Sequence, residues 1–544
     1  MKQPSLEQIK NIDRASLERA YLAMSARVEE QSKIIDEMAL EIELLKELNR
    51  LKSRLPFTPS TEQLSLLFDE AELLSQDEDE EQEKTRVASH QRAKHKKHDL
   101  TTLPADTPVT HVYHDAPEHT TCDRCETPLQ QKADKVVYKV AVVPRSYMLE
   151  VHHFATFACN NCEADEGEQN LVTHWENKDT DTLIASTSLV ADCAVRKYAD
   201  ALPLYRQEAI FKREGFNVSR QTISNWLLTY MNLLTPLRQQ YKKYLFSAPL
   251  INQDETPVKV IHLPEPATSK STCMFVQVGT SEHDGVMRHV VLFTYLRNKL
   301  NPTLESMSEG YQGYVMTDGL KGYLSIDKHL NCWVHASRGF KNIIKTNKKA
   351  QGALKFVNTI NRLFRIERDA RRLYQDKEQF LTERKKAAAE VFGDLKKLID
   401  ENRGVYSSKS PMGQAISYLD TYWASLTRYV DCYESDPGNN IAENAIRPYV
   451  VGRKNWLFSN TEVGADASSF YYSMIETAKL NGVNVADYMW YCLSEAPRCT
   501  TESDWENLLP WNMDADTITA LKKRRASAIP DPARTEPYVL RGAR

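Results

Sequence analysis

Five short apolar runs, rich in β-branched and aromatic residues, follow one another between residues 249 and 336. They read PLINQDETPVKVI, TCMFVQVGT, RHVVLFTYL, GYVMTDGLKGYL and HLNCWVHA. Runs of this length and composition are typical of β-strands. Because the connections between them are mixed in length and composition, we expect these strands to form one sheet within an α/β domain.

Two aspartates occupy strand positions in this group. Asp254 lies inside the first run, and Asp318 directly follows the apolar residues 314–317. A carboxylate in an apolar neighbourhood is costly without a cation or a hydrogen-bond donor, which favours a metal site. The alternative is a turn residue, since an aspartate before a glycine, as in TDG, is common in turns.

A third carboxylate lies in the segment SDPGNNIAENAIRPYVVGRKNWLFSN. A turn at its Pro-Gly pair precedes an expected helix, which Asn439 or Asn440 should cap and whose first turn contains Glu443. Three carboxylates suit two Mg²⁺ ions about 3.5–4 Å apart, an arrangement that promotes in-line phosphoryl displacement. We therefore predict phosphodiester chemistry at Asp254, Asp318 and Glu443.

Basic residues accompany the carboxylates in the sequence. The helix of Glu443 continues to three cations that could meet phosphate: Arg447, Arg453 and Lys454. The chain between Asp318 and Glu443 is longer than one strand and one helix need, which predicts a helical insertion at about 341–405. Arginines at helical spacing line one side of it: Arg362, Arg365, Arg368 and Arg372. We interpret this side as a DNA clamp, the alternative being an ordinary solvated face.

Residues 175–240 are apolar at helical spacing, with an interruption around Gly215. Ser219 can cap the helix that follows, and Ile223, Trp226 and Leu227 are expected to face inward. The exposed start of that helix carries polar side chains suited to DNA contact: Arg220, Gln221, Ser224 and Asn225. A helix-turn-helix-like DNA-binding domain is the favoured interpretation, and an ordinary helical hairpin is the alternative.

Two CxxC pairs lie within residues 106–172. Their thiols belong to Cys122, Cys125, Cys159 and Cys162. Each pair places two thiolates on a tight turn, and two such turns predict one structural Zn²⁺ ion, with four unliganded thiols as the alternative. A closed four-thiolate site leaves no position for a substrate, so we assign it to folding or DNA contact.

The two ends of the chain carry other patterns. Residues 17–52 show a heptad repeat, so residues 1–55 are expected to form a coiled coil, unless they form a long helix packed on its own domain. Residues 56–105 form a linker, acidic and then basic; its basic run could lie on phosphates or be a solvated tail. Residues 496–544 are interpreted as a C-terminal tail.

Composition excludes some classes of protein. No stretch approaches the roughly 18 consecutive apolar residues of a membrane helix, and the N-terminus shows no secretory signal pattern, so we expect a cytoplasmic protein. A net charge of -4 neither requires nor excludes a nucleic-acid partner.

Taken together, these motifs resemble those of the transposases of insertion sequence 66 type. QDETPVKV, YVMTDGLKGY, CWVHASRGF, NNIAENAIRP and GRKNWLFSN are similar to the family's catalytic motifs in order and spacing. KYADALPLYRQE with SRQTISNW resembles its helical DNA-binding segment, and the paired CxxC its zinc region. Two features depart from the usual pattern: Ser337 and Gly339 stand where basic residues are common, and Asn444 replaces a usual arginine.

The resemblance implies a multidomain α+β protein with a ribonuclease H-like catalytic domain at 245–495, bearing the triad Asp254, Asp318 and Glu443. It also implies that His335 and Arg338 support the active site, although His335 could be an ordinary core histidine. The implied activity is Mg²⁺-dependent cleavage at the ends of a mobile element and transfer of the 3′-hydroxyl strand into target DNA, with Mn²⁺ as an alternative ion.

The implied partners are element-end and target DNA, a second copy in a homodimer or higher oligomer, and accessory proteins of the same element. The implied location is the bacterial nucleoid. Two other functions stay open: a catalytically inactive domesticated regulator that binds DNA, and a nuclease without strand transfer.

Overall fold

The computed structural model describes residues 147, 149–158, 171–263, 272–298, 306–319, 321–323, 326–347 and 349–528. The predicted coiled coil, the charged linker and the four paired cysteines lie outside the described residues and stay predictions. Among the helices of the described part, none is both long and apolar enough to cross a membrane.

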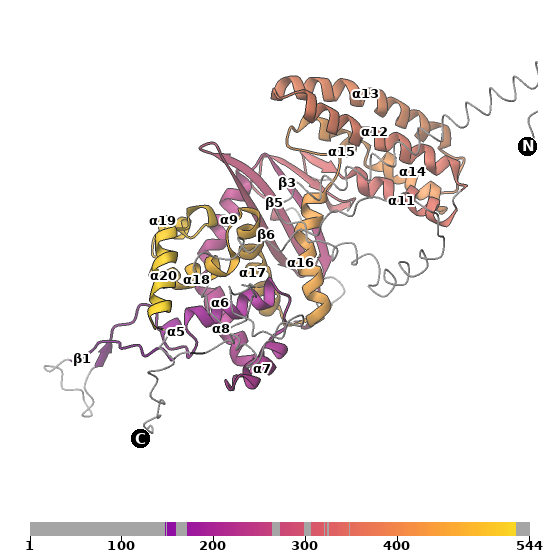
Figure 1. Ribbon diagram of the computed structural model, residues 1–544. Coiled ribbons are helices and arrows are strands. Elements are labelled where there is room, and N and C mark those ends of the chain that lie inside the picture. Colours follow the sequence, from indigo (N-terminus) through magenta and orange to yellow (C-terminus); the bar gives the residue numbers. More distant parts are fainter. Residues whose placement is uncertain are drawn as a thin grey trace, which may run out of the picture. The chain divides into compact units, whose positions relative to one another are not determined.

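A five-stranded mixed sheet forms the centre of the described structure (Figure 1). Its strands are β3 (Leu250–Pro257), β5 (Cys273–His283), β6 (Val286–Leu296), β7 (Tyr314–Thr317) and β8 (His329–Asn331). Across the sheet the order is β6-β5-β3-β7-β8. The β3-β5 and β5-β6 pairs are antiparallel, whereas β3-β7 and β7-β8 are parallel. Each predicted apolar run overlaps one of these strands, so the expected mixed α/β arrangement is confirmed.

Helices precede the sheet, follow β8 and end the described chain. The first group is α5 (Lys178–Asp181), α6 (Thr187–Tyr198), α7 (Leu204–Arg213), α8 (Arg220–Leu233) and α9 (Thr235–Phe246). The second is α11 (Trp333–Thr346), α12 (Gln351–Leu373), α13 (Lys377–Asn402), α14 (Pro411–Thr421), α15 (Trp423–Thr427) and the 3-10 turn η4 (Arg428–Asp431). The third is α16 (Asn440–Trp456), α17 (Glu462–Leu480), α18 (Val485–Glu495), α19 (Glu502–Asn507) and α20 (Ala515–Ala528).

The remaining elements are short. They are the pairs β1 (Thr156–Ala158) with β2 (Leu171–Thr173) and β4 (Val260–His262) with β9 (Ser459–Thr461), and the 3-10 turns η3 (Lys321–Tyr323), η5 (Ala496–Arg498) and η6 (Pro510–Asn512). The helical insertion expected at about 341–405 falls within the group α11 to η4.

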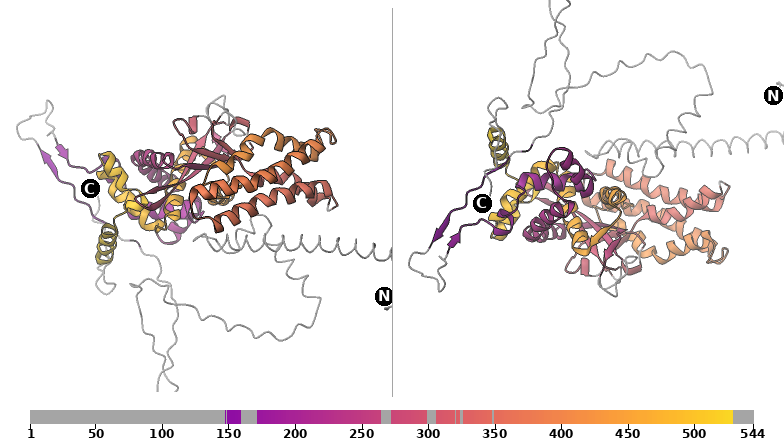
Figure 2. Two further views of the ribbon diagram at one scale, coloured as in Figure 1. Left: turned by 90° about the horizontal axis from the view of Figure 1, so that it is seen from above. Right: turned by 90° about the horizontal axis from the view of Figure 1, so that it is seen from below.

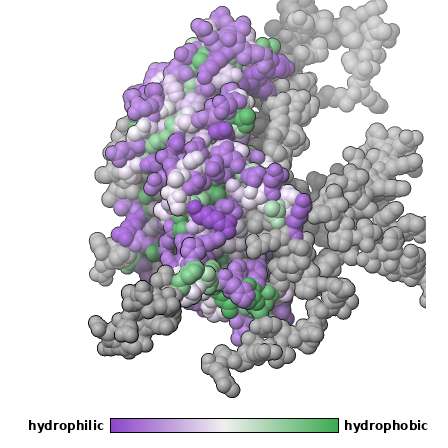
Figure 3. All heavy atoms as spheres, turned by 90° about the vertical axis from the view of Figure 1, so that its left-hand side faces the viewer, coloured by the Kyte–Doolittle hydropathy of each residue, from purple (hydrophilic) through white to green (hydrophobic). Residues whose placement is uncertain are grey.

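Two main hydrophobic cores pack against different parts of the sheet. One joins α6, α8, α9, α17 and α18 to β5 and β6, and the other joins α11 to α15 to Leu250, Met316 and Leu330 of the sheet. Figure 1 and both views of Figure 2 accordingly show α11 to α14 at one end of the sheet and α6, α8 and α18 at the other. The face drawn in Figure 3 is mostly hydrophilic, with apolar side chains in small separate groups.

One face of strand β3 packs against helix α16. Successive side chains of a strand point to opposite faces, so Asn252, Asp254 and Thr256 share one face. Helix α16 lies on that face, since its Asn439 end and its Arg453 hydrogen-bond to Asn252 and Thr256. Alternation along β3 therefore directs Asp254 toward the helix that carries Glu443.

Helix α17 covers the exposed edge of β6 with side chains spaced four residues apart. Ser473 Oγ, Thr477 Oγ1 and Asn481 Oδ1 accept hydrogen bonds from the backbone N–H groups of Phe293, Val291 and His289 at 2.8, 3.0 and 3.1 Å. Four helical residues rise about 6 Å and two strand residues about 6.6 Å, so the two spacings match. The edge strand is thereby prevented from pairing with another chain.

Removing one of these bonds should destabilise the protein. Thr477→Val keeps the side-chain shape but leaves a buried N–H group of Val291 without its acceptor, so we expect a loss of about 1–3 kcal/mol in the free energy of unfolding. Urea unfolding measures it. The control is Ser468→Ala, because Ser468 is also buried on α17 but bonds only to the Gly464 carbonyl of its own helix. Equal losses in the two variants would refute a special role for the edge contact.

Candidate active site

Asp254 lies in the middle of β3 and is half-buried. Its Oδ1 accepts a hydrogen bond from the backbone N–H of Glu255 at 2.9 Å. Burial is the main cause that raises the pKa of Asp254 to about 7; the Glu255 N–H lowers the pKa, and the charges of Glu255, Glu443 and Asp318 add to the rise. The three carboxylates predicted from the sequence are thus close enough to interact.

Asp318 directly follows β7, as predicted. Its charge raises the pKa values of Tyr418 on α14 and of Tyr422, the residue after that helix, although burial is the larger cause for both. The next residue, Gly319, packs against Tyr418 so closely that an added Cβ would lie 2.3 Å from the ring. A larger residue after Asp318 would therefore force the Tyr418 side chain of α14 to shift.

Glu443 lies in the first turn of α16, as predicted, but the expected side-chain cap is wrong. Asn439 is the N-cap residue, yet its side chain makes no capping bond. Instead its Nδ2 donates to the Gln253 carbonyl at 2.7 Å, and its Oδ1 accepts from Asn252 Nδ2 at 3.0 Å. This buried amide ties the start of α16 to β3 beside Asp254, a role that the motif NNIAEN did not reveal.

At the start of α11, Cys332 and His335 lie beside Glu443 of α16. His335 Nδ1 is 3.6 Å from Glu443 Oε1, and the two side chains are 18% and 25% exposed. Burial lowers the pKa of His335, and the charge of the exposed Arg338 lowers it further. His335 is therefore a neighbour of the third carboxylate rather than a histidine of the apolar core. Sequence reasoning missed Cys332, although its Cys-x2-His spacing to His335 was a signal.

The two unusual residues on α11 have a packing explanation. Ser337 is buried, and its Oγ donates to the Val334 carbonyl at 2.8 Å. At Gly339 an added Cβ would lie 2.9 Å from Cβ of Ala415 on α14. The close approach of α14 thus leaves no room for a long basic side chain at Gly339 without a shift, and at Ser337 such a side chain would occupy a buried position.

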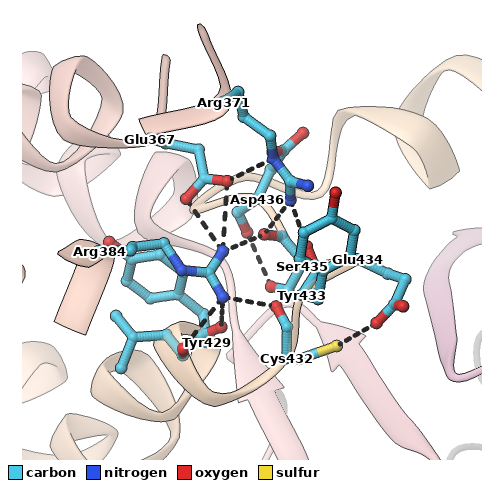
Figure 4. Close-up of polar contacts among 10 residues, drawn as sticks. Glu367, Arg371, Arg384, Tyr429, Cys432, Tyr433, Glu434, Ser435 and Asp436 are labelled. Carbon is cyan, nitrogen blue, oxygen red and sulfur yellow. Dashed lines mark hydrogen bonds and ion pairs between the residues drawn. The ribbon is translucent and has the colours of Figure 1, made fainter. Parts of the chain in front are cut away.

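A buried arginine organises the segment that leads into α16 (Figure 4). Arg384 of α13 is 0% exposed and contacts Glu367 of α12 at 3.1 Å. Its guanidinium also donates to the carbonyls of Tyr429, Val430, Cys432 and Ser435. Arg371 adds a bond to Glu367 at 2.9 Å. The helices before α16 therefore hold the chain from which Glu443 projects.

Two of the cations predicted to contact DNA bond instead to other residues of the protein. Arg362 forms ion pairs with Glu390, at 3.1 Å, and Asp394, both on α13. Arg453 donates to Thr256 Oγ1 at 2.8 Å and to the Pro257 carbonyl, which fastens α16 to the end of β3.

The other predicted cations near the site differ in exposure. Arg365 and Lys454 are exposed, Arg447 is half-buried, and Arg368 lies 3.8 Å from Asp369. Arg365, Lys454 and Arg447 are therefore the most direct candidates for phosphate.

The start of α8 has the expected form. Ser219 Oγ accepts a hydrogen bond from the Thr222 N–H at 3.1 Å, so the predicted cap is confirmed. Three residues are buried as predicted: Ile223, Trp226 and Leu227. The expected DNA-contacting residues are exposed or half-buried: Arg220, Gln221, Ser224 and Asn225. Their contact with DNA stays a prediction.

The raised pKa of Asp254 predicts how the magnesium-free protein responds to pH. Its folded-state pKa of about 7 exceeds the ordinary value of 3.8, so the folded protein binds more protons between these values. Stability should therefore fall as pH rises through this window, by up to about 1.4 kcal/mol per pH unit. Asp254→Asn should flatten the slope in urea unfolding. An unchanged slope would show that Asp254 titrates at an ordinary pKa.

Comparison with known proteins gives the family. The model of the Transposase IS66 family matches residues 182–467, which is more than half of the 544-residue chain, and the IS66 C-terminal element matches residues 473–511. The first match contains Asp254, Asp318 and Glu443.

Three curated relatives come from Sinorhizobium fredii (strain NBRC 101917 / NGR234). Uncharacterized protein y4qI is 27% identical over 61% of this chain and 63% of its own length. Uncharacterized protein y4jD is 25% identical over 74% of this chain and 80% of its own. Uncharacterized protein y4hP is 23% identical over 72% and 73%. The chain thus spans less than two thirds of the first relative. By the match to more than half of its length, the chain belongs to the IS66 family of transposases.

Proposed function

We propose that this protein is a DNA transposase that cleaves the ends of a mobile element and transfers the freed 3′-hydroxyl strand into target DNA. One observation carries the proposal: Asp254, Asp318 and Glu443 come from β3, the end of β7 and the start of α16, and the charges of the other two raise the pKa of Asp254. Three converging carboxylates are the donor set of two-metal phosphoryl transfer.

The residues present fit magnesium. Asp254 is half-buried among like charges, an arrangement that is costly unless a cation or protons compensate it. Carboxylate oxygens are the ligands that Mg²⁺ and Mn²⁺ prefer. We propose that Asp254, Asp318 and Glu443 hold two such ions, which when bound would activate the attacking oxygen and stabilise the leaving oxygen.

The chain's own residues position the reacting groups in this proposal. Asn439 fixes the start of α16 against β3, and His335 limits the positions open to the Glu443 carboxylate. Arg338, exposed one turn beyond His335 on α11, is placed to meet a phosphate. The strand order β6-β5-β3-β7-β8 supports a ribonuclease H-like assignment for this domain, since one antiparallel half and one parallel half meet at β3.

We further propose that DNA is held by α8 and by the cations of α12 and α16, and that the four paired cysteines bind one Zn²⁺. Residues 1–55 would join two or more copies, because two element ends must be held together. Accessory proteins of the same element are proposed partners, and the bacterial nucleoid is the proposed place of action.

Cleavage of element-end DNA tests the proposal. The purified full chain is mixed with a labelled duplex that carries the terminal repeats found in the DNA flanking the gene. We expect Mg²⁺-dependent cleavage at the repeat boundary, and no cleavage after chelation. Binding without cleavage in Mg²⁺ and in Mn²⁺ would instead support a regulator, and cleavage without any joining would support a nuclease.

A further inference from the structure

Three potential metal ligands of different chemistry meet at the Glu443 end of the carboxylate cluster. They are Cys332, the N-cap residue of α11, His335 in the first turn of that helix, and Glu443 in the first turn of α16. One ligand atom from each lies within 4.8 Å of the other two. Two helix starts that are far apart in the sequence thus bring a thiol, an imidazole and a carboxylate to one point.

Two of these atoms lack the contacts that buried polar atoms usually have. His335 Nδ1 and Glu443 Oε1 are buried, and neither has a hydrogen-bond partner among the described residues. Their separation of 3.6 Å is longer than a hydrogen bond. Most buried polar atoms have a hydrogen-bond partner. Two neighbouring buried atoms without one therefore suggest a missing ligand.

The donor set selects the kind of ion. Mg²⁺ prefers oxygen ligands in an octahedron, whereas a thiolate and an imidazole favour Zn²⁺-type ions. Tetrahedral Zn²⁺ takes such ligands at about 2.0–2.3 Å, which places neighbouring ligands roughly 3.3–3.8 Å apart. The His335–Glu443 separation of 3.6 Å already falls in this range. Three protein ligands also leave a fourth position open.

We propose that Cys332, His335 and Glu443 form a site for a Zn²⁺-type ion, distinct from the magnesium ions and from the zinc of the paired cysteines. The site shares Glu443 with the proposed catalytic cluster. An ion held there engages the carboxylate that magnesium needs, so occupancy inhibits Mg²⁺-dependent cleavage. This regulatory consequence rests on the proposed function, whereas the binding site itself does not.

Cobalt binding tests the site directly. Co²⁺ is added to the full chain purified with its zinc, and thiolate-to-cobalt absorption is recorded. Cys332→Ala should weaken the binding that gives this band at least about tenfold, because even outer-shell changes weaken metal sites about 10–100-fold. Cys492→Ala is the matched control, since it removes a buried thiol on α18. Loss of the band in neither variant, or equal loss in both, would overturn the proposal.

Zinc inhibition tests the consequence. With Mg²⁺ fixed, increasing Zn²⁺ should suppress DNA cleavage in the wild type and in Cys492→Ala, each compared with its own zinc-free rate. Cys332→Ala should need at least about tenfold more Zn²⁺ for the same suppression. If no protein cleaves DNA but the cobalt band depends on Cys332, the proposed function fails and the site stands. If cleavage occurs and the band is independent of Cys332, only the site fails.

Discussion

Arg384→Met should lower the free energy of unfolding by about 3–5 kcal/mol, because Glu367 loses its fully buried partner and keeps only the half-buried Arg371. Glu367 is 5% exposed and Arg384 is 0% exposed, so water cannot replace the lost contact. The carbonyls of Tyr429, Val430 and Cys432 also lose the Arg384 donor, whereas that of Ser435 keeps a longer bond from Arg371. The linked segment precedes α16, so cleavage activity should fall as well. Urea unfolding followed by circular dichroism gives the stability difference.

Arg362→Met is the matched control for this prediction. Arg362 lies on the neighbouring helix α12 and also pairs with two acids, but its side chain is 38% exposed. Exposed ion pairs contribute about 0–1 kcal/mol, so this variant should be nearly as stable as the wild type. Similar losses in both variants would mean that the Arg384 contacts hold the segment before α16 no better than a surface pair.

Replacing any one of Asp254, Asp318 and Glu443 by alanine should reduce Mg²⁺-dependent cleavage by at least about a thousandfold. Residues that act as one catalytic unit are strongly non-additive, so a double variant should be barely worse than a single one. DNA binding should change little, because α8 and the exposed cations are intact. Single-turnover cleavage and filter binding on the same duplex separate the two effects.

Replacing a pair of arginines on α12 should impair DNA binding rather than the carboxylate site. Replacing Arg365 and Arg368 together should weaken DNA binding and flatten its salt dependence by roughly two counterions' worth of slope, while the carboxylates stay in place. If Glu443→Ala kept near-normal cleavage, the third carboxylate would have to lie elsewhere. If the double arginine variant kept its salt slope, α12 would not contact DNA.

Local patterns predicted much of the sheet and the candidate site. The strands that contain Asp254 and Asp318 follow from runs of apolar residues, and the turn before Glu443 follows from its Pro-Gly pair, because strand and turn chemistry depend on neighbouring residues. That the three carboxylates serve one site was inferred from their suitability for two metal ions and from the family resemblance, since no local pattern states which strands are neighbours. The inward face of α8 was likewise predictable from helical spacing.

Contacts between distant segments could not be predicted. Arg362 belongs to a run in which cations predominate, and only the folded chain shows that Glu390 and Asp394 neutralise it. Asn439 was expected to cap its own helix, but β3 offers its side chain a carbonyl and an amide instead. Such partners lie far apart in the sequence, so no period or motif records them.

Joining of a pre-cut element end to target DNA is the measurement that bears most directly on a single phosphoryl-transfer site at Asp254, Asp318 and Glu443. The substrate is a labelled duplex with a free 3′-hydroxyl at the repeat boundary, mixed with supercoiled plasmid, purified full chain and Mg²⁺ or Mn²⁺. We predict that the wild type attaches the label to the plasmid and that Glu443→Gln binds the end equally well but does not join it. Joining by Glu443→Gln at the wild-type rate, or no joining by a wild-type protein that binds the end, would contradict the proposed transposase.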